Sequence, residues 1–112
     1  MKKLVFVLFF ATLTSLSAFA QKTYELLTPE ETFYQAQDLF AHEKYVAAKA
    51  AFEAYIGKTN ATAPYRIDAE YYQGLCAMNL FHPDAEFLLT TFVRNHPDSH
   101  WKQSVYLELG NF

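Results

Sequence analysis

The chain has 112 residues, of which 12 are acidic and 9 are lysine or arginine, and its formal net charge is −3. This length allows at most one compact domain, and the single cysteine excludes a disulfide framework. The mild acidity, without a cluster of lysine and arginine, argues against nucleic acid and anionic membrane surfaces as partners.

Residues 1–20 have the pattern of a secretory signal peptide. Lys2 and Lys3 precede an apolar run at residues 4–11, and Ala18-Phe19-Ala20 fits the A-x-A cleavage pattern. The alternative, an uncleaved membrane anchor, needs about 20 apolar residues, and this run is shorter. We therefore expect cleavage after Ala20 and an exported protein, periplasmic or secreted, that can associate with the outer membrane and keeps no membrane span.

Residues 21–28 are predicted to be an irregular lead-in to the first helix. Thr28 can cap that helix, Pro29 suits its first position, and Glu31 completes a capping box of the S/T-x-x-E type. Apolar residues then recur at helical spacing, which predicts a helix up to about His42.

Further helices are predicted at short intervals along the rest of the chain. The second should begin near Lys44 and end at Gly57, with the glycine in a left-handed conformation. Because the turn before it is so short, the first two helices must be antiparallel neighbours. No lasting period-two alternation predicts a strand. The remaining helices are expected at about residues 65–80, from residue 83 to a break at 95–98, and after Asp98 or Ser99, either of which is a good N-cap.

Small residues and aromatic rings recur at regular places in these helices. The landmarks Ala36, Gly74 and Gly110 lie 38 and 36 residues apart. Small residues allow two helices to cross closely, and rings fill the space between successive helix pairs. The first unit carries the pattern at Ala36, Tyr45, Ala48 and Phe52, and a weaker second unit carries it at Gly74, Ala85, Phe92 and Pro97.

This pattern resembles the tetratricopeptide repeat, a family built from pairs of antiparallel helices. The resemblance covers residues 29–112 and implies an all-α fold, with two complete units and the first helix of a third stacked as a short right-handed α-solenoid. Four positions depart from the family pattern. Tyr55 replaces the alanine near the end of the second helix, Phe92 is a bulky substitution, His82 stands where an aromatic is usual, and Asn60 replaces the closing proline of the first unit. An ordinary helical bundle with similar apolar stripes is the alternative.

The resemblance also implies a site for a partner. In this family the first helices of successive units line a groove that binds peptides or helices. The rings and amides at these positions suit stacking and hydrogen bonding to such a partner, although Phe33 and Phe40 fit a place in the core equally well. The candidate groove residues are Phe33, Gln37, Phe40, Tyr71, Met78, Asn79, Leu107 and Asn111.

Histidines and a cysteine are the side chains that invite a catalytic or metal-binding interpretation. His96 and His100 have the i, i+4 spacing of zinc ligands on a helix, but Pro97 lies between them and breaks the helix. Cys76 falls on the apolar side of its helix, where a buried packing thiol is usual. We therefore expect no catalytic residue, no metal site and no cofactor.

The sequence thus predicts a non-enzymatic, exported scaffold that binds a peptide or helix of a cell-envelope partner in the repeat groove. Degenerate repeats beside a signal peptide are similar in style to envelope members of the family, which serve outer-membrane protein insertion, cell division or secretion. One alternative is an accessory repeat segment fused to a larger envelope protein or enzyme. Another is a helical bundle around a small ligand, which requires a closed apolar cavity.

Overall fold

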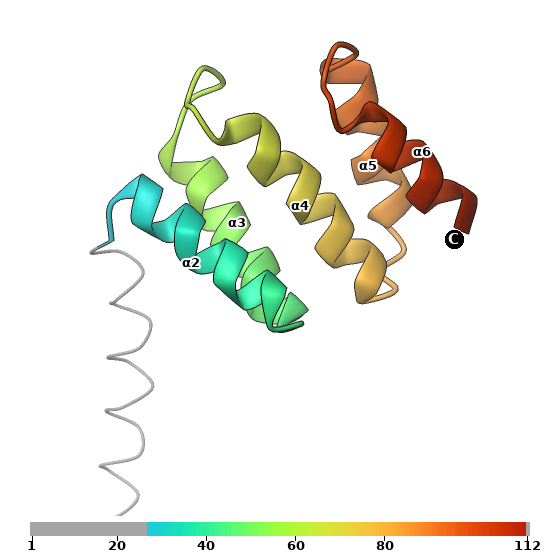
Figure 1. Ribbon diagram of the computed structural model, residues 1–112. Coiled ribbons are helices and arrows are strands. Elements are labelled where there is room, and N and C mark those ends of the chain that lie inside the picture. The colour runs from blue at the N-terminus through green and yellow to red at the C-terminus, as the bar shows by residue number, and fades with distance from the viewer. Residues whose placement is uncertain (1–26, 112) are drawn as a thin grey trace, which may run out of the picture.

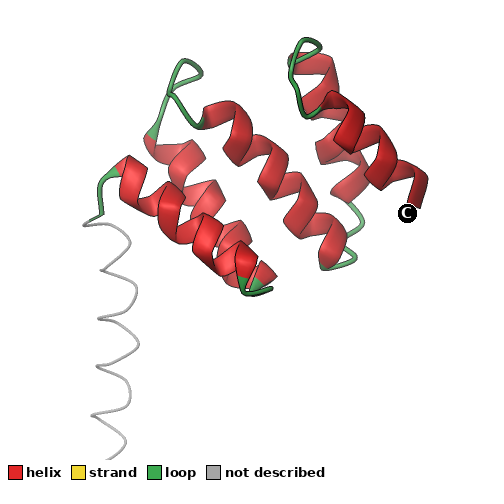
Figure 2. Ribbon diagram, in the orientation of Figure 1, coloured by secondary structure: helices red, strands yellow, loops and turns green. Residues whose placement is uncertain are grey.

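The computed structural model describes residues 27–111, with side chains up to residue 110, and this part of the chain is all helical (Figures 1 and 2). The predicted signal peptide and most of the lead-in lie outside the described residues. None of the described helices is long and apolar enough to cross a membrane. The five helices are α2 (Pro29–Ala41), α3 (Tyr45–Lys58), α4 (Arg66–Asn79), α5 (Ala85–Asn95) and α6 (Lys102–Asn111).

The helices pack in the order in which they occur in the chain. Each lies chiefly against its neighbours in sequence, so that α2, α4 and α6 follow one another across Figure 1 with α3 and α5 behind them. We call α2 with α3 the first hairpin and α4 with α5 the second hairpin. The predicted positions of the helices are confirmed, with ends that differ by one to three residues.

The start of α2 is fixed by local chemistry, as the capping pattern predicted. The Thr28 hydroxyl accepts a hydrogen bond from the Glu31 N–H at 3.2 Å, and the Glu31 carboxylate accepts one from the Thr28 N–H at 3.1 Å. Two N–H groups without helical partners are thereby satisfied. The acidic side chains of the first turn also face the positive end of the helix dipole.

The prediction of a left-handed glycine at the end of α3 is wrong. No described glycine has positive φ, and α3 continues through Gly57 to Lys58. The helix ends instead at Thr59, whose hydroxyl donates to the Tyr55 carbonyl at 2.7 Å. The left-handed residues are Glu43 (φ 59°) and Phe81 (φ 56°), in the turns inside the two hairpins.

The turns of the two hairpins are built alike. In the first, the N–H groups of Glu43 and Lys44 bond to the carbonyls of Phe40 and Leu39, at 3.0 and 2.9 Å. The same pair of bonds occurs 38 residues further on, from Phe81 and His82 to Met78 and Ala77, at 3.1 and 2.9 Å. Both are Schellman turns, which satisfy the last carbonyls of a helix and reverse the chain within a few residues.

Two hydrophobic clusters hold the hairpins together. The first joins α2, α3 and α4 around the fully buried side chains of Phe33, Phe52 and Tyr55. The second joins α4, α5 and α6, and its members include Leu89, Phe92 and Val105.

Aromatic rings join the successive units. Phe33 of α2 stacks on Tyr65, just before α4, with ring centroids 4.6 Å apart and planes within 3°. Tyr71 of α4 stacks in the same way on Trp101, just before α6, at 4.3 Å and 12°. The Tyr55 hydroxyl also accepts a hydrogen bond from the Tyr65 N–H at 3.0 Å, which fixes the start of α4 against α3.

Candidate interaction surface

The residues predicted to line a groove are split between the core and the surface. Gln37 and Asn79 are exposed, and Leu107 is 69 % exposed. Phe40 is partly buried between the two clusters, where its ring meets those of Tyr45 and Tyr72. Asn111 ends α6, and its side chain lies outside the described part of the chain.

The other three predicted residues are inaccessible in the folded chain. Phe33 is 2 % exposed, Tyr71 4 % and Met78 8 %. The expectation that these side chains face a groove is corrected, because the rings that follow each hairpin cover Phe33 and Tyr71. The structure brings Phe40, Tyr71 and Met78 together in one cluster, whereas Gln37 and Asn79 stay outside it. The binding of a partner in the groove stays a prediction.

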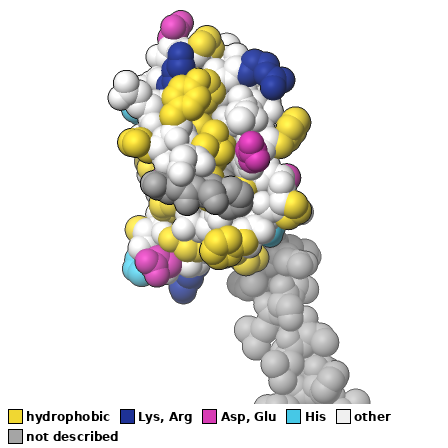
Figure 3. Space-filling view, turned by 90° about the vertical axis from the view of Figure 1, so that its right-hand side faces the viewer, with side chains coloured by type: hydrophobic (Ala, Val, Ile, Leu, Met, Phe, Trp, Pro, Cys, Tyr) yellow, Lys and Arg dark blue, Asp and Glu magenta, His cyan; other side chains and the backbone are white. Residues whose placement is uncertain are grey.

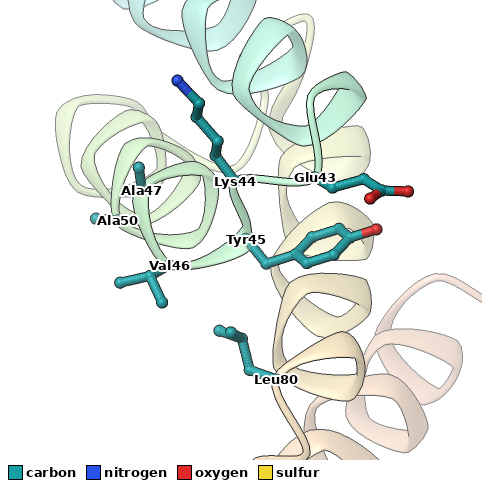
Figure 4. A pocket seen from close by; sticks show the side chains of 7 residues that line it. All are labelled: Glu43, Lys44, Tyr45, Val46, Ala47, Ala50 and Leu80. Atoms are coloured by element: carbon teal, nitrogen blue, oxygen red, sulfur yellow. The ribbon is translucent and has the colours of Figure 1, made fainter.

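An apolar hollow lies where α3 begins and α4 ends. It has a volume of about 590 Å³ and its lining atoms are almost all apolar. Figure 4 shows Val46 of α3 and Leu80 of the α4 end pointing toward one another across it, while the charged ends of Glu43 and Lys44 point away. We call this feature the turn hollow, and its lining residues are Glu43, Lys44, Tyr45, Val46, Ala47, Ala50 and Leu80.

Two exposed apolar side chains accompany the turn hollow. Val46, in its lining, is 71 % exposed, and Phe81, the residue after Leu80, is 82 % exposed. Phe81 holds its ring in water on a left-handed backbone, a conformation that costs a residue with a side chain about 1–2 kcal/mol. Residues held in such sparsely populated conformations cluster at functional sites. The turn hollow and Phe81 therefore form the strongest candidate for contact with a partner.

Sequence reasoning did not find the turn hollow, although α3 contains a signal for it. The first turns of α3 are apolar on nearly every side, with Val46, Ala47 and Ala50 in addition to the buried Ala48 and Ala51. A helix that is apolar all round is normally buried all round. Because the outer side of α3 is open at Val46 and Ala50, its apolar residues there lack a neighbour within the described chain.

Several of the titratable groups form structural pairs. Glu70 of α4 accepts a bond from Arg66 Nε at 3.1 Å and lies 2.6 Å from His96 Nε2, which ties the end of α5 to α4. His42 donates from Nδ1 to the Asp38 carbonyl at 2.8 Å and so caps the end of α2. His100 packs on Trp101. Within the described residues, no group of three or more histidine, cysteine, aspartate and glutamate side chains has the arrangement of a metal site.

Cys76 is a packing residue of the first cluster. Its side chain is fully buried, as the sequence predicts. Burial raises the pKa of the thiol from 9.0 to about 12, although the nearby Lys49 opposes the shift. Because the thiolate is the nucleophilic form, Cys76 is a poor nucleophile at neutral pH.

Comparison with known proteins adds no further assignment. No protein-family model matches the chain, and no match exists among the curated proteins or the solved structures.

Proposed function

We propose that this chain is a non-enzymatic, exported repeat scaffold of the tetratricopeptide type, which binds a protein of the cell envelope. The likeness between its hairpins supports the repeat. Two Schellman turns recur at a spacing of 38 residues. In both units, a ring from the first helix of the hairpin stacks on the ring that follows the hairpin. Stacked helix pairs bury a continuous core and leave long surfaces free for partners. A short right-handed solenoid is the arrangement proposed for them.

The turn hollow is the observation that carries the binding function. Its size and apolar lining suit one or two large aliphatic or aromatic side chains of a partner segment. Phe81, the residue after Leu80, offers an exposed ring that a partner can cover. The charged ends of Glu43 and Lys44 point away from the hollow and leave its apolar lining open to this contact.

The predicted groove contributes to this proposal through its accessible members. Gln37 on α2 and Asn79 on α4 are the exposed amides of the candidate set. Phe33, Tyr71 and Met78 act as supports that position α2 and α4, because they are buried.

Site-specific photocrosslinking tests the turn hollow in the living cell. A photoreactive phenylalanine analogue at Val46 should give a discrete crosslinked species, because the side chain would lie against the partner. The same analogue at Gln35, another exposed position but on α2, is the matched control and should give none. Leu80→Gln should weaken the crosslink at position 46 while the helical circular dichroism stays unchanged. Equal crosslinking at both positions, or none at position 46, would refute the site.

Export is tested separately by the mass of the mature protein. A chain that begins at Gln21 supports the proposed periplasmic or secreted location. A chain that retains Met1 contradicts it without bearing on the turn hollow.

A further inference from the structure

The loop between the two hairpins, residues 59–65, contains a motif that the proposed function leaves unused. Asn60 and Thr62, with an alanine between them, form the pattern N-x-[ST] in which the middle residue is not proline. This pattern marks asparagines that accept an N-linked glycan in secreted proteins. Asn79 and Asn95 lack a serine or threonine two residues later, so the motif is absent there.

The structure places the motif on the surface. Residues 60–62 are all exposed, and they lie at one end of the molecule between α3 and α4 (Figure 1). The loop around them is held in place, since Arg66 donates to the Thr59 carbonyl at 2.9 Å and the Ala63 N–H to the Asn60 carbonyl at 3.1 Å. A modifying enzyme can therefore reach the Asn60 side chain without opening either hairpin.

Hydrogen bonds fix which end of the Asn60 amide faces outward. Its Oδ1 accepts from the Thr62 N–H at 3.0 Å and from the Thr62 hydroxyl at 2.7 Å. Because a backbone N–H can only donate, the atom that it meets is the oxygen, and the NH₂ group is the other end of the amide. Within the described residues, Nδ2 of Asn60 makes no hydrogen bond, whereas Nδ2 of Asn79 donates to the Leu75 carbonyl at 2.9 Å.

A turn by itself does not require the threonine. The bond from Oδ1 to the backbone N–H two residues later is enough for an Asx turn, and almost any residue at position 62 supplies that N–H. The Thr62 hydroxyl adds a second bond to the same oxygen. This hydroxyl is also the group that the N-x-[ST] pattern demands.

We propose that Asn60 carries an N-linked glycan in the exported protein. The inference rests on the export part of the proposed function, because the motif is read in secreted chains. The donor is a sugar chain linked to a polyprenyl diphosphate. Nδ2 of Asn60 attacks C1 of the first sugar, and the C1–O bond to the diphosphate breaks. The diphosphate leaves with the electron pair of that bond, and one amide proton passes to a base of the transferase.

A glycan at this place leaves the turn hollow open. Both hairpin turns, and the hollow with them, lie at the opposite end of the helices in Figure 1. Figure 3 faces the side formed by α6, where hydrophobic side chains are spread over the surface, and the 59–65 loop lies away from that side. Because a glycan is bulky and solubilising, it would keep one end of the molecule in solvent while the hollow stays free for a partner.

Mass spectrometry of the protein isolated from the cells that make it tests this assignment. Trypsin cleaves after Lys58 and Arg66, which releases residues 59–66 as one peptide. A glycan should raise the mass of this peptide in the parent chain. Fragmentation of the peptide should place the added mass on Asn60 and not on a threonine.

Two substitutions at position 62 form a matched pair. Thr62→Val replaces the hydroxyl by a methyl group and keeps the backbone N–H, so it should abolish the modification. Thr62→Ser keeps a hydroxyl at the same place and should stay modified. Position 62 is exposed, so circular dichroism should show the same helix content for both variants.

The same spectra separate this proposal from the proposed function. An unmodified 59–66 peptide in a chain that begins at Gln21 would overturn the glycan and leave export standing. Modification that persists in Thr62→Val, or that fragmentation places on a threonine, would also overturn it. An unmodified chain that retains Met1 would overturn the glycan and export together. Crosslinking at position 46 should be the same in Thr62→Val as in the parent, because the turn hollow does not depend on the glycan.

Discussion

The two hairpins close the same helix crossing with different pairs of side chains. In the first, Ala36 keeps its methyl group and shares a cluster with the buried ring of Phe52. In the second, the corresponding residues are Gly74 and Leu89, and the leucine lies directly on the glycine backbone. The comparison teaches that the residue on one helix of a crossing limits which residue the facing helix can carry there. Opposite Leu89 a methyl group would clash, whereas the buried Ala36 keeps its methyl group within the first cluster.

The largest expected effect concerns Phe52, the aromatic residue of the first hairpin in this comparison. Phe52 is fully buried, meets Phe33 and stacks on Tyr72 with centroids 5.2 Å apart, so it links the first hairpin to the second. We expect Phe52→Ala to lower the free energy of unfolding by about 3–5 kcal/mol. Urea denaturation followed by circular dichroism measures this loss.

The control for this prediction lies on the same helix. Val46 is 71 % exposed, so Val46→Ala should change the free energy of unfolding by no more than about 0.5 kcal/mol. A loss of similar size for both variants would show that α3 is less firmly packed than the structure indicates.

The next largest effect concerns Gly74, the glycine of the second hairpin in this comparison. In Gly74→Ala the new methyl group meets a buried leucine, and overpacking of this kind costs about 1–3 kcal/mol. The gain in helix propensity, about 1 kcal/mol, offsets only part of that cost. The melting temperature should therefore fall.

Two comparisons sharpen the result. Gly57→Ala and Gly110→Ala meet no described neighbour, so each should raise stability by up to about 1 kcal/mol. In a Leu89→Ala background the methyl group at position 74 has room, and Gly74→Ala should then be neutral or stabilising. If Gly74→Ala stabilises the parent chain, the steric explanation of the glycine is wrong.

The junctions between units differ in a similar way, and this difference has a smaller expected effect. Tyr65 is held by hydroxyl contacts, including one of 2.8 Å to Tyr34, whereas Trp101 donates from Nε1 to the Asp68 carboxylate at 2.6 Å. We expect Asp68→Ala to cost about 1 kcal/mol, less than the usual cost of losing a bond to a charged group, because the pair is only partly buried. Trp101 is the single tryptophan, so its fluorescence reports both unfolding and loosening of this junction.

Conservative variants show whether the hydrogen bond to Trp101 or the negative charge of Asp68 stabilises this junction. Asp68→Asn keeps an acceptor for the indole N–H and should cost less than Asp68→Ala. Tyr34→Phe removes the exposed hydroxyl pair and should cost less than either aspartate variant. Equal losses for both aspartate variants would assign the effect to the charge.

Much of this fold was predictable because its determinants are local. The capping box at Thr28 and Glu31, the short turns and the apolar periodicity each act within a few residues of the chain. The side of a helix that is covered depends on distant residues instead. For Phe33 the sequence left core and groove open, because its cover comes from α3 and from Tyr65, and Tyr65 lies more than 30 residues away in the chain. The turn hollow was missed for a related reason, since the outer side of α3 is exposed only because no other described helix reaches it.

The smallest effect concerns the feature in which the hairpins agree most closely. Glu43 and Phe81 take the same left-handed conformation in equivalent turns, where a glycine would be free of strain. Glu43→Gly and Phe81→Gly should each raise the free energy of unfolding by about 0.5–1 kcal/mol, since the strain relieved exceeds the entropy that glycine adds to the unfolded chain. Thermal denaturation of the two variants beside Phe81→Ala, which keeps the strain, measures this gain.

The two turns should then differ in function although they agree in stability. Phe81→Gly removes the exposed ring that follows Leu80 in the chain. If that ring contacts the partner, this more stable protein should crosslink less at position 46, whereas Glu43→Gly should keep the crosslink. If both variants are more stable and only Phe81→Gly crosslinks less, the ring of Phe81 contacts a partner, although its backbone conformation lowers stability. If Phe81→Gly binds as the parent does, the ring has no such role, and its conformation follows only from the turn that both hairpins share.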